Sequence, residues 1–287
     1  MTRTAARSGA VLGLVALGVA LAACSPSGSA PADDPAVTVE KGIEYPGADG
    51  SALEADACVP TSEGPHPAVV LVHGGAFAEG DRGTMGSICR ALGDQGFAAF
   101  AVDYRLIPAT YPAQIDDVSA SIRWLREDAQ VERFGLDGSL SLLGSSAGAI
   151  IALSTAESLE TASTPVDAVV ALSPAASLTA DAAQLGDPRP DLESVVQAYL
   201  GCDDLAQCPD AAAASPVQSA QLLPPTLIVH GSDELIPLAQ AELLDGALAD
   251  AGITHDLVVV DGAKHGLQLL NNDTRRSIVS FLRDNAK

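Results

Sequence analysis

Uninterrupted apolar runs alternate with amphipathic segments along most of the chain. Residues 67–72 form one such run, which is typical of a strand buried on both faces of a sheet. Within residues 114–127, apolar side chains recur every three or four positions, which gives a helix one apolar face. This alternation predicts an α/β fold, in which helices cover both faces of a mostly parallel sheet. The expected strands are residues 37–45, 53–59, 67–72, 96–102, 140–143, 166–172, 226–230 and 255–260, and the expected helices are residues 85–95, 114–127, 237–251 and 269–285.

Two parts of the chain depart from this alternation. The first two predicted strands are separated by a short turn at residues 47–50 that contains two glycines, which predicts an antiparallel pair. Residues 173–223 are rich in proline and have no strong hydrophobic period. A segment of this length within an alternating fold predicts a cap-like insertion over a functional site.

The first 23 residues have the features of a signal peptide. Two arginines precede an apolar stretch, residues 9–23, that is shorter than the roughly 20 residues a membrane-spanning helix needs. The stretch runs through small residues into Cys24, and this arrangement resembles a bacterial lipobox, whose cysteine is acylated and becomes the new N-terminus. The alternative is ordinary secretory cleavage after Ala23, which would leave Cys24 as a free thiol.

The lipobox interpretation predicts an exported protein that is lipid-anchored to the outer face of the bacterial cell membrane. Each buried methylene of an acyl chain contributes about 0.8 kcal/mol, so two or three chains hold a protein at a membrane surface. Residues 24–36 are rich in serine, proline and alanine and are expected to form a flexible tether. Residues 37–287 then form one domain with a sizeable core.

Four cysteines remain after Cys24, an even number in a chain that is expected to be exported. Two disulfides are therefore expected in an oxidising compartment, and four buried thiols are the alternative. Four cysteines allow three pairings, among which sequence does not decide. We favour Cys202–Cys208, which closes a short loop, and Cys58–Cys89, which ties the early sheet to the first helix.

The charge of the chain excludes some partners. There are 37 acidic and 15 basic residues, a net charge of −22. Nucleic acids and other polyanions are repelled by such a chain, so no nucleic-acid partner is expected. Aromatic residues make up only 3% of the sequence, which argues against an extended cleft that stacks on sugars.

A serine lies at the centre of the pattern Gly-Ser-Ser-Ala-Gly at residues 144–148. The pattern follows an apolar run and precedes a helix-like run, so Ser146 is placed on a sharp turn between a strand and a helix. Such a turn exposes a serine hydroxyl to a general base, which makes Ser146 the candidate nucleophile. The alternative interpretation is a glycine-serine turn that only caps the helix.

The general base and its carboxylate partner are expected on loops after the last two strands. His265 follows the strand 255–260 by a short loop and is the candidate base, whereas His230 is interpreted as a packing residue. Asp233 follows the strand 226–230 and is the candidate acid, with Glu234 as the alternative. This acid orients the imidazole and stabilises its charged form.

An oxyanion hole needs backbone N–H groups that point at the negative oxygen of a tetrahedral intermediate. Gly74 and Gly75 follow the strand 67–72, and glycines allow the backbone to approach a ligand closely. Ala147 follows the candidate nucleophile. These three residues are the candidate donors, and His73 is expected to brace their loop.

Several short motifs occur together between residues 67 and 266. They are His-Gly-Gly-Ala-Phe at 73–77, Asp-Tyr-Arg-Leu at 103–106, Tyr-Pro-Ala-Gln at 111–114, Asp117, Trp-Leu at 124–125 and the serine turn at 144–148. This set resembles bacterial carboxylesterases of the α/β-hydrolase superfamily, in particular the bifunctional feruloyl and acetyl-xylan esterase branch and the hormone-sensitive-lipase-like esterases. The resemblance implies an α/β-hydrolase fold and the same triad of Ser146, Asp233 and His265. Ser145 and Ala149 depart from the residues that many relatives have there and leave the acyl preference open.

These observations predict a serine carboxylic-ester hydrolase that uses neither a metal nor a cofactor. It is expected to act on short-chain acyl esters through an acyl-enzyme. One alternative is a serine peptidase like prolyl oligopeptidase, which the lack of a propeller-sized N-terminal region disfavours. The other is a non-catalytic surface-binding lipoprotein, which the presence of all three triad residues disfavours.

Overall fold

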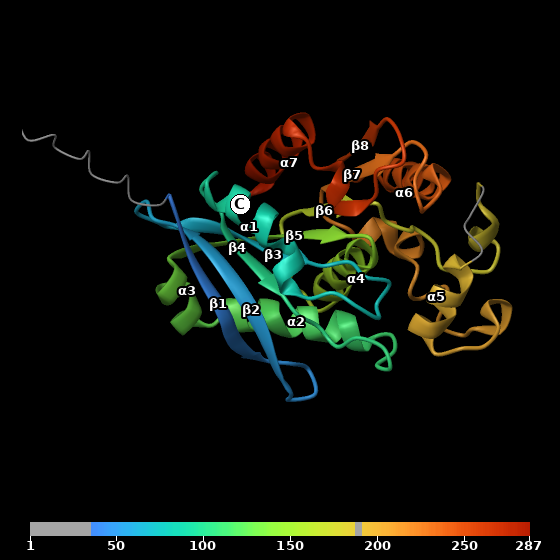
Figure 1. Cartoon of the computed structure of the whole chain (residues 1–287), viewed down its shortest axis with the longest axis horizontal. Coiled ribbons are helices and arrows are strands. Elements are labelled where there is room, and N and C mark those ends of the chain that lie inside the picture. The colour runs from blue at the N-terminus through green and yellow to red at the C-terminus, as the bar shows by residue number, and fades with distance from the viewer. Residues whose placement is uncertain (1–35, 187–190) are drawn as a thin grey trace, which may run out of the picture. The chain divides into compact units, whose positions relative to one another are not determined.

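A computed structural model describes residues 36–186 and 191–287, which belong to the unit Pro35–Lys287 (Figure 1). The predicted signal peptide, Cys24 as the predicted site of acylation and residues 24–35 of the predicted tether lie outside these residues. Within them, no helix is long and apolar enough to cross a membrane.

The described residues form an eight-stranded sheet in the order β1-β2-β4-β3-β5-β6-β7-β8. As predicted, β1 and β2 pair with each other antiparallel. β2 also pairs antiparallel with β4, and the six strands from β4 to β8 are parallel to one another. The carboxyl ends of the parallel strands therefore collect at one edge, where ligands bind in open α/β sheets. The strands are β1 Val37–Pro46, β2 Ala52–Pro60, β3 His66–Val72, β4 Ala98–Val102, β5 Leu136–Ser145, β6 Val169–Leu172, β7 Thr226–Gly231 and β8 His255–Val260.

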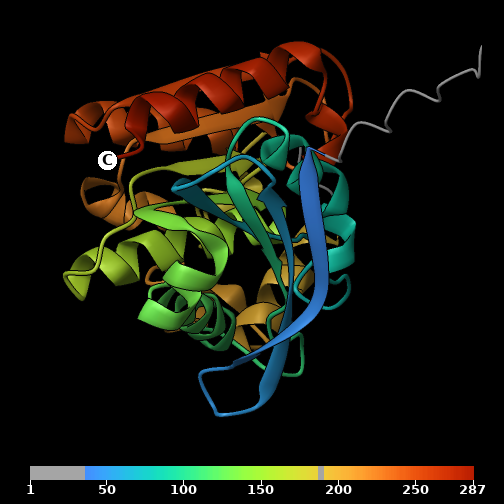
Figure 2. The same cartoon turned by 90° about the vertical axis from the view of Figure 1, so that its left-hand side faces the viewer.

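Helices cover both faces of the sheet. α1 and α7 lie on one face, and Figure 2 shows α7 running along it. The second and larger core lies on the other face, where α2, α4 and α6 pack. The helices are α1 Gly86–Gly93, α2 Ala113–Leu125, α3 Asp128–Phe134, α4 Ala147–Thr161, α5 Leu192–Leu200, α6 Leu238–Ala251 and α7 Asn272–Asn285, and the 3₁₀ helices are η1 Arg82–Met85, η2 Ala182–Gln184, η3 Leu205–Gln207, η4 Pro216–Leu222 and η5 Gly266–Leu269.

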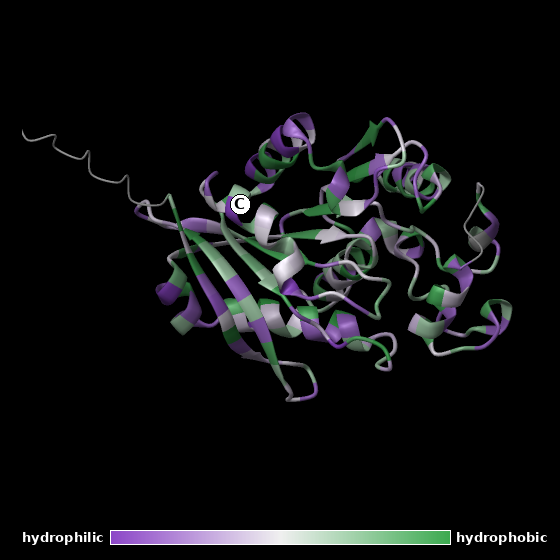
Figure 3. Ribbon diagram, in the orientation of Figure 1, coloured by the Kyte–Doolittle hydropathy of each residue, from purple (hydrophilic) through white to green (hydrophobic). Residues whose placement is uncertain are grey.

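The pattern of hydrophobicity explains which strands are central. The central strands are apolar over most of their length, whereas β1 and β2 alternate apolar and polar positions (Figure 3). In β4 all five residues are buried, because helices cover both faces of that strand. Complete burial of one Val or Leu side chain contributes about 1.5–3 kcal/mol, so these strands form the stable frame of the domain.

Among the elements that differ from the sequence prediction are α3 and β5. α3 was not predicted, because it has only seven residues and ends at Gly135, which takes a left-handed conformation with φ 61°. β5 begins at Leu136, four residues before the predicted strand. The Asp137-Gly138 pair within it is typical of a turn, but His66 pairs with Leu136 and extends the strand through that pair.

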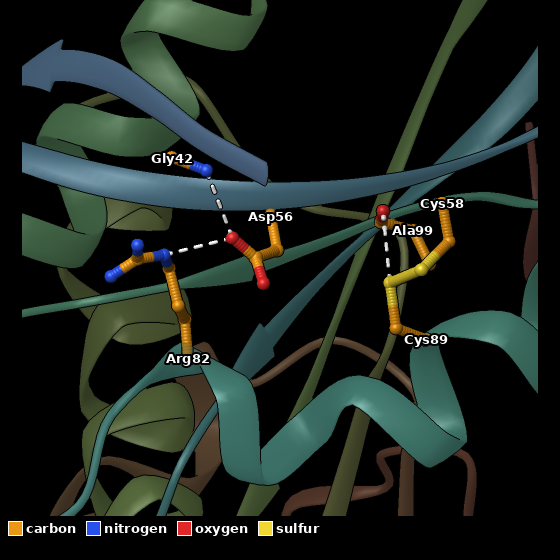
Figure 4. The surroundings of a disulfide bond; sticks show 6 residues. All are labelled: Gly42, Asp56, Cys58, Arg82, Cys89 and Ala99. Atoms are coloured by element: carbon orange, nitrogen blue, oxygen red, sulfur yellow. Dashed lines mark hydrogen bonds and ion pairs between the residues drawn. A yellow bond between two sulfur atoms is a disulfide. The ribbon is translucent and has the colours of Figure 1, made fainter. Parts of the chain in front are cut away.

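Both favoured disulfides are present. Cys58 on β2 is bonded to Cys89 on α1, with 5.7 Å between their Cα atoms. Figure 4 shows this bond beside Asp56, whose carboxylate accepts hydrogen bonds from the Gly42 amide and from Arg82 on η1. Cys202 is bonded to Cys208 in the segment after α5. The first disulfide and the Asp56–Arg82 ion pair both fasten the segment η1–α1 to β2.

Candidate active site

Ser146 lies at the apex of the turn between β5 and α4. Its backbone has φ 56° and ψ −122°, which is a strained conformation for a residue other than glycine. The turn is tight because its neighbours are small: a Cβ atom at Gly144 would lie 2.1 Å from the Gly148 carbonyl oxygen, and one at Gly148 would lie 2.2 Å from the Val72 carbonyl oxygen. The Ser146 hydroxyl makes no capping hydrogen bond to the helix. The alternative of a simple capping serine is therefore wrong.

His265 faces this serine. Its Nε2 lies 2.8 Å from Ser146 Oγ, within hydrogen-bond distance. The loop after β8 comes this close because Gly266 follows the histidine with φ 56°, and a Cβ atom there would lie only 2.6 Å from Ser145 Oγ. The structure thus brings together the predicted nucleophile and the predicted base, which are 119 residues apart in the sequence.

The predicted position of Asp233 beside the imidazole is wrong. Glu234 contacts His265 Nδ1 through its Oε2 atom, and its carboxylate is fully buried. Asp233 is exposed, and its backbone N–H donates to the Gly262 carbonyl oxygen at 3.2 Å. Asp233 and Glu234 are adjacent in one turn. The composition of the turn does not determine which of the two carboxylates points toward the imidazole. The alternative acid, Glu234, occupies the position beside the base.

The other oxygen of the Glu234 carboxylate has three donors around it. Oε1 lies 2.8 Å from Ser173 Oγ, 3.0 Å from the Gly231 amide nitrogen and 2.9 Å from His230 Nδ1. Burial by itself raises the pKa of Glu234, but hydrogen bonds from His230, His265 and the Gly231 amide outweigh burial and lower the pKa to about 2. The carboxylate is therefore ionised at neutral pH. The sequence pattern predicts only a packing role for His230 and no role for Ser173.

The loop after β3 lies beside Ser146, as predicted for the oxyanion donors. Gly75 has φ 119°, and a Cβ atom there would lie 1.9 Å from the Glu79 carbonyl oxygen, so only glycine fits. Among the described residues, the N–H groups of Gly74, Gly75 and Ala147 have no hydrogen-bond acceptor. Backbone N–H groups that border a cavity without a partner are available to a ligand.

His73 braces this loop. The imidazole stacks on Tyr104 with 4.3 Å between ring centroids, and the Tyr104 hydroxyl donates to the His73 carbonyl oxygen at 2.9 Å. Burial lowers the pKa of His73, which favours the neutral imidazole. Its Nδ1 lies 2.7 Å from the Gly74 carbonyl oxygen, so this nitrogen carries the proton. The contacts confirm the predicted bracing role.

Two cavities meet at Ser146. The smaller one, about 130 Å³, is lined almost entirely by apolar side chains. The larger one, about 460 Å³, is wide open and is bordered by Glu79, Thr84, His265 and Gln268. The segment between β6 and β7, which includes the predicted insertion, supplies much of the small cavity. Its contributions are Ala175, Leu178, Asp191, Leu192, Val195 and Val196.

Stacked aromatic rings join this segment to the candidate oxyanion loop. Phe77 and Tyr199, the latter on α5, have ring centroids 3.8 Å apart and planes inclined by 10°. Both rings are buried.

Within the described parts of the chain, no group of three or more His, Cys, Asp or Glu side chains is arranged to hold a metal ion.

Comparison with known proteins agrees with this geometry. The family model BD-FAE matches residues 56–248. Carboxylesterase/phospholipase LipF of Mycobacterium tuberculosis is 32% identical over 86% of this chain and 69% of its own length. Esterase LipC of the same organism is 31% identical, and the match covers 77% of this chain and 61% of LipC.

A solved structure shows the same fold. The bacterial heroin esterase superposes with a TM-score of 0.77 at 24% identity, over 88% of this chain and 85% of that one. The predicted α/β-hydrolase fold and the resemblance to carboxylesterases are confirmed. The chain therefore belongs to the BD-FAE family, among the carboxylic-ester hydrolases of the α/β-hydrolase fold.

Proposed function

We propose that the protein is a serine carboxylesterase that hydrolyses short-chain acyl esters through an acyl-enzyme. The observation that carries this proposal is the continuous contact from Ser146 through His265 to Glu234. These are the nucleophile, base and orienting acid of a catalytic triad, with glutamate in place of the predicted aspartate. The comparisons favour an esterase over a prolyl-oligopeptidase-like peptidase or a non-catalytic lipoprotein.

The proposed reaction has two halves. In the first, Ser146 Oγ attacks the ester carbonyl carbon while His265 Nε2 takes the hydroxyl proton, and the resulting oxyanion accepts hydrogen bonds from backbone N–H groups of Gly74, Gly75 and Ala147. The imidazolium then gives this proton to the departing alcohol oxygen as the ester bond breaks. In the second half, water attacks the carbonyl carbon of the acyl-enzyme while His265 Nε2 accepts a water proton. The imidazolium then returns this proton to Ser146 Oγ as the bond between the acyl group and this oxygen breaks and the free acid leaves.

The shapes of the two cavities support a short acyl group. Because the cavity of about 130 Å³ is apolar and small, we place the acyl chain there. The open cavity of about 460 Å³ accommodates the alcohol part without a close fit. A short acyl chain therefore sits in a defined space, and alcohols of different size are tolerated.

The serine assignment is tested with two adjacent variants. Ser146→Ala is expected to abolish hydrolysis of p-nitrophenyl acetate and labelling by a fluorophosphonate probe, because both require the nucleophilic oxygen. Ser145→Ala is the matched control, because it removes the neighbouring hydroxyl and keeps Ser146. Covalent labelling of the Ser146→Ala protein would disprove the proposed nucleophile.

We also propose that the protein is exported and lipid-anchored through Cys24, as its N-terminal sequence predicts. The two disulfides support an oxidising compartment, where such bonds persist. In a bacterial host, Cys24→Ala is expected to move the protein from the membrane fraction to the soluble fraction and to abolish incorporation of labelled palmitate. A Cys24→Ala protein that still incorporates palmitate would contradict the anchor.

A further inference from the structure

The candidate triad contains a glutamate, whose side chain has one more rotatable bond than that of aspartate. A carboxylate on a longer stem loses more freedom when it is held in one orientation. Oε2 contacts His265, but this contact alone does not fix the plane of the carboxylate. The donors on the opposite oxygen, Oε1, are therefore the groups that determine its orientation.

His230 supplies one of these donors. Its ring is completely buried, and Nδ1 lies 2.9 Å from Glu234 Oε1 and 2.9 Å from the Gly231 carbonyl oxygen. Both neighbours are acceptors, so Nδ1 carries the proton in either charge state of the ring. Nε2 has no hydrogen-bond partner among the described residues. An apolar side chain would fill this space without burying an unpartnered nitrogen, so packing alone does not explain a histidine here.

Ser173 supplies a second donor and links the acid to the base. Its hydroxyl donates to Glu234 Oε1 at 2.8 Å and accepts from the Gly266 N–H at 2.8 Å, directly after His265. The residue is completely buried and has φ 54°, a conformation that costs energy for a residue other than glycine. The N–H of Ser173 donates to the Val229 carbonyl oxygen at 2.9 Å, which anchors the residue to β7.

We propose that His230 and Ser173 are positioning residues that hold the Glu234 carboxylate so that Oε2 faces His265. They act through Glu234, and neither residue lines the two cavities that meet at Ser146. The inference rests on the proposed function, since it assigns roles within the same triad. It adds two residues, 57 positions apart in the sequence, that meet at one carboxylate oxygen.

A matched pair of substitutions tests the donor at position 230. Asn and Leu have nearly the same shape, and the amide nitrogen of Asn can take the place of Nδ1, whereas Leu has no donor. His230→Leu is expected to lower kcat for p-nitrophenyl acetate by about 10–100-fold with KM changed less than about 2-fold, because a small misplacement of catalytic groups costs up to about 10²-fold. His230→Asn should recover most of that loss. Equal kcat values for the two variants would overturn the proposal.

A double-mutant cycle separates positioning from general stability. In a Glu234→Ala background, neither His230→Leu nor Ser173→Ala should lower kcat further, because the group they orient is gone. A penalty that persists in that background would show that the residues act independently of Glu234 and would overturn the proposal. Thermal unfolding identifies any variant that does not fold. If His230→Leu does not fold, the cycle of Ser173→Ala with Glu234→Ala provides the same test.

The two levels of the hypothesis fail differently. If the triad is wrong, Ser146→Ala keeps its activity, whatever the substitutions at 230 and 173 do. If only the positioning role is wrong, Ser146→Ala is inactive, and His230→Leu either behaves like wild type or lowers kcat equally in the Glu234→Ala background.

Discussion

At the scale of single residues, the turn after β7 determines which carboxylate serves the base. Glu234 is buried against His265, whereas Asp233 is one position away and exposed. Replacing Glu234 with Gln removes the charge that stabilises the imidazolium, and kcat is expected to fall by about 10³–10⁴-fold, as when the acid of a serine triad becomes an amide. Asp233→Asn is the matched control and should change kcat less than about 2-fold. Steady-state kinetics on p-nitrophenyl acetate distinguish them, and a large loss at Asp233 alone would reverse the assignment.

The same carboxylate makes stability depend on pH. The pKa of Glu234 is about 2 in the folded protein and 4.5 in its ordinary state, so the unfolded chain binds the proton more tightly. Ionised Glu234 therefore stabilises the fold above pH 4.5, and this contribution is lost as the pH falls toward 2. Between pH 6 and pH 3 the loss is about 2 kcal/mol.

Urea unfolding at several pH values measures this contribution. Glu234→Gln cannot titrate, so the difference in unfolding free energy between wild type and this variant should shrink by that amount as the pH is lowered. A difference that is constant with pH would show that the folded carboxylate is not held in its ionised form.

At the scale of elements, α5 forms one wall of the small cavity beside Ser146. Leu192, Val195 and Val196 all line that cavity. Val195→Ala removes two methyl groups from the wall, so the preferred p-nitrophenyl ester is expected to become longer, with kcat/KM for the hexanoate rising relative to the acetate. Val279→Ala on α7 is the control, since Val279 is half-buried and lines a different cavity. An unchanged chain-length profile would place the acyl chain elsewhere.

At the scale of the whole molecule, hydrophobic period determined most of what sequence could predict. α2 follows from its apolar period, and the buried strands around β3 follow from their continuous apolar runs, because burial stabilises both patterns strongly. α3 could not be predicted from periodicity, because its seven residues make too few turns for a period to be recognised. Ser146 and His265 were predicted because each follows a strand at the carboxyl edge. The contacts of His230 and Ser173 with Glu234 were not, because they depend on the exact path of two loops.

The global stability of the domain depends on its two disulfides to different degrees. Cys58 and Cys89 are 31 residues apart, and Cys202 and Cys208 only 6. A cross-link restricts the unfolded chain more when it closes a longer loop, so loop entropy predicts a loss of about 4 kcal/mol for Cys58→Ser/Cys89→Ser and about 2 kcal/mol for Cys202→Ser/Cys208→Ser. The first bond also joins β2 to α1, whereas the second lies within the single segment between α5 and β7.

Urea unfolding of the two double variants measures this difference. Because the global unfolding transition reports the whole domain, the Cys58→Ser/Cys89→Ser protein should have the lower midpoint of the two variants. Reduction of wild type with dithiothreitol under unfolding conditions breaks both bonds, so it should lower the wild-type midpoint at least as far as the Cys58→Ser/Cys89→Ser substitution does. The Cys202→Ser/Cys208→Ser protein should keep a larger share of wild-type stability. The opposite order of midpoints would mean that the segment after α5 contributes more to the cooperative core than the contact of α1 with the sheet does.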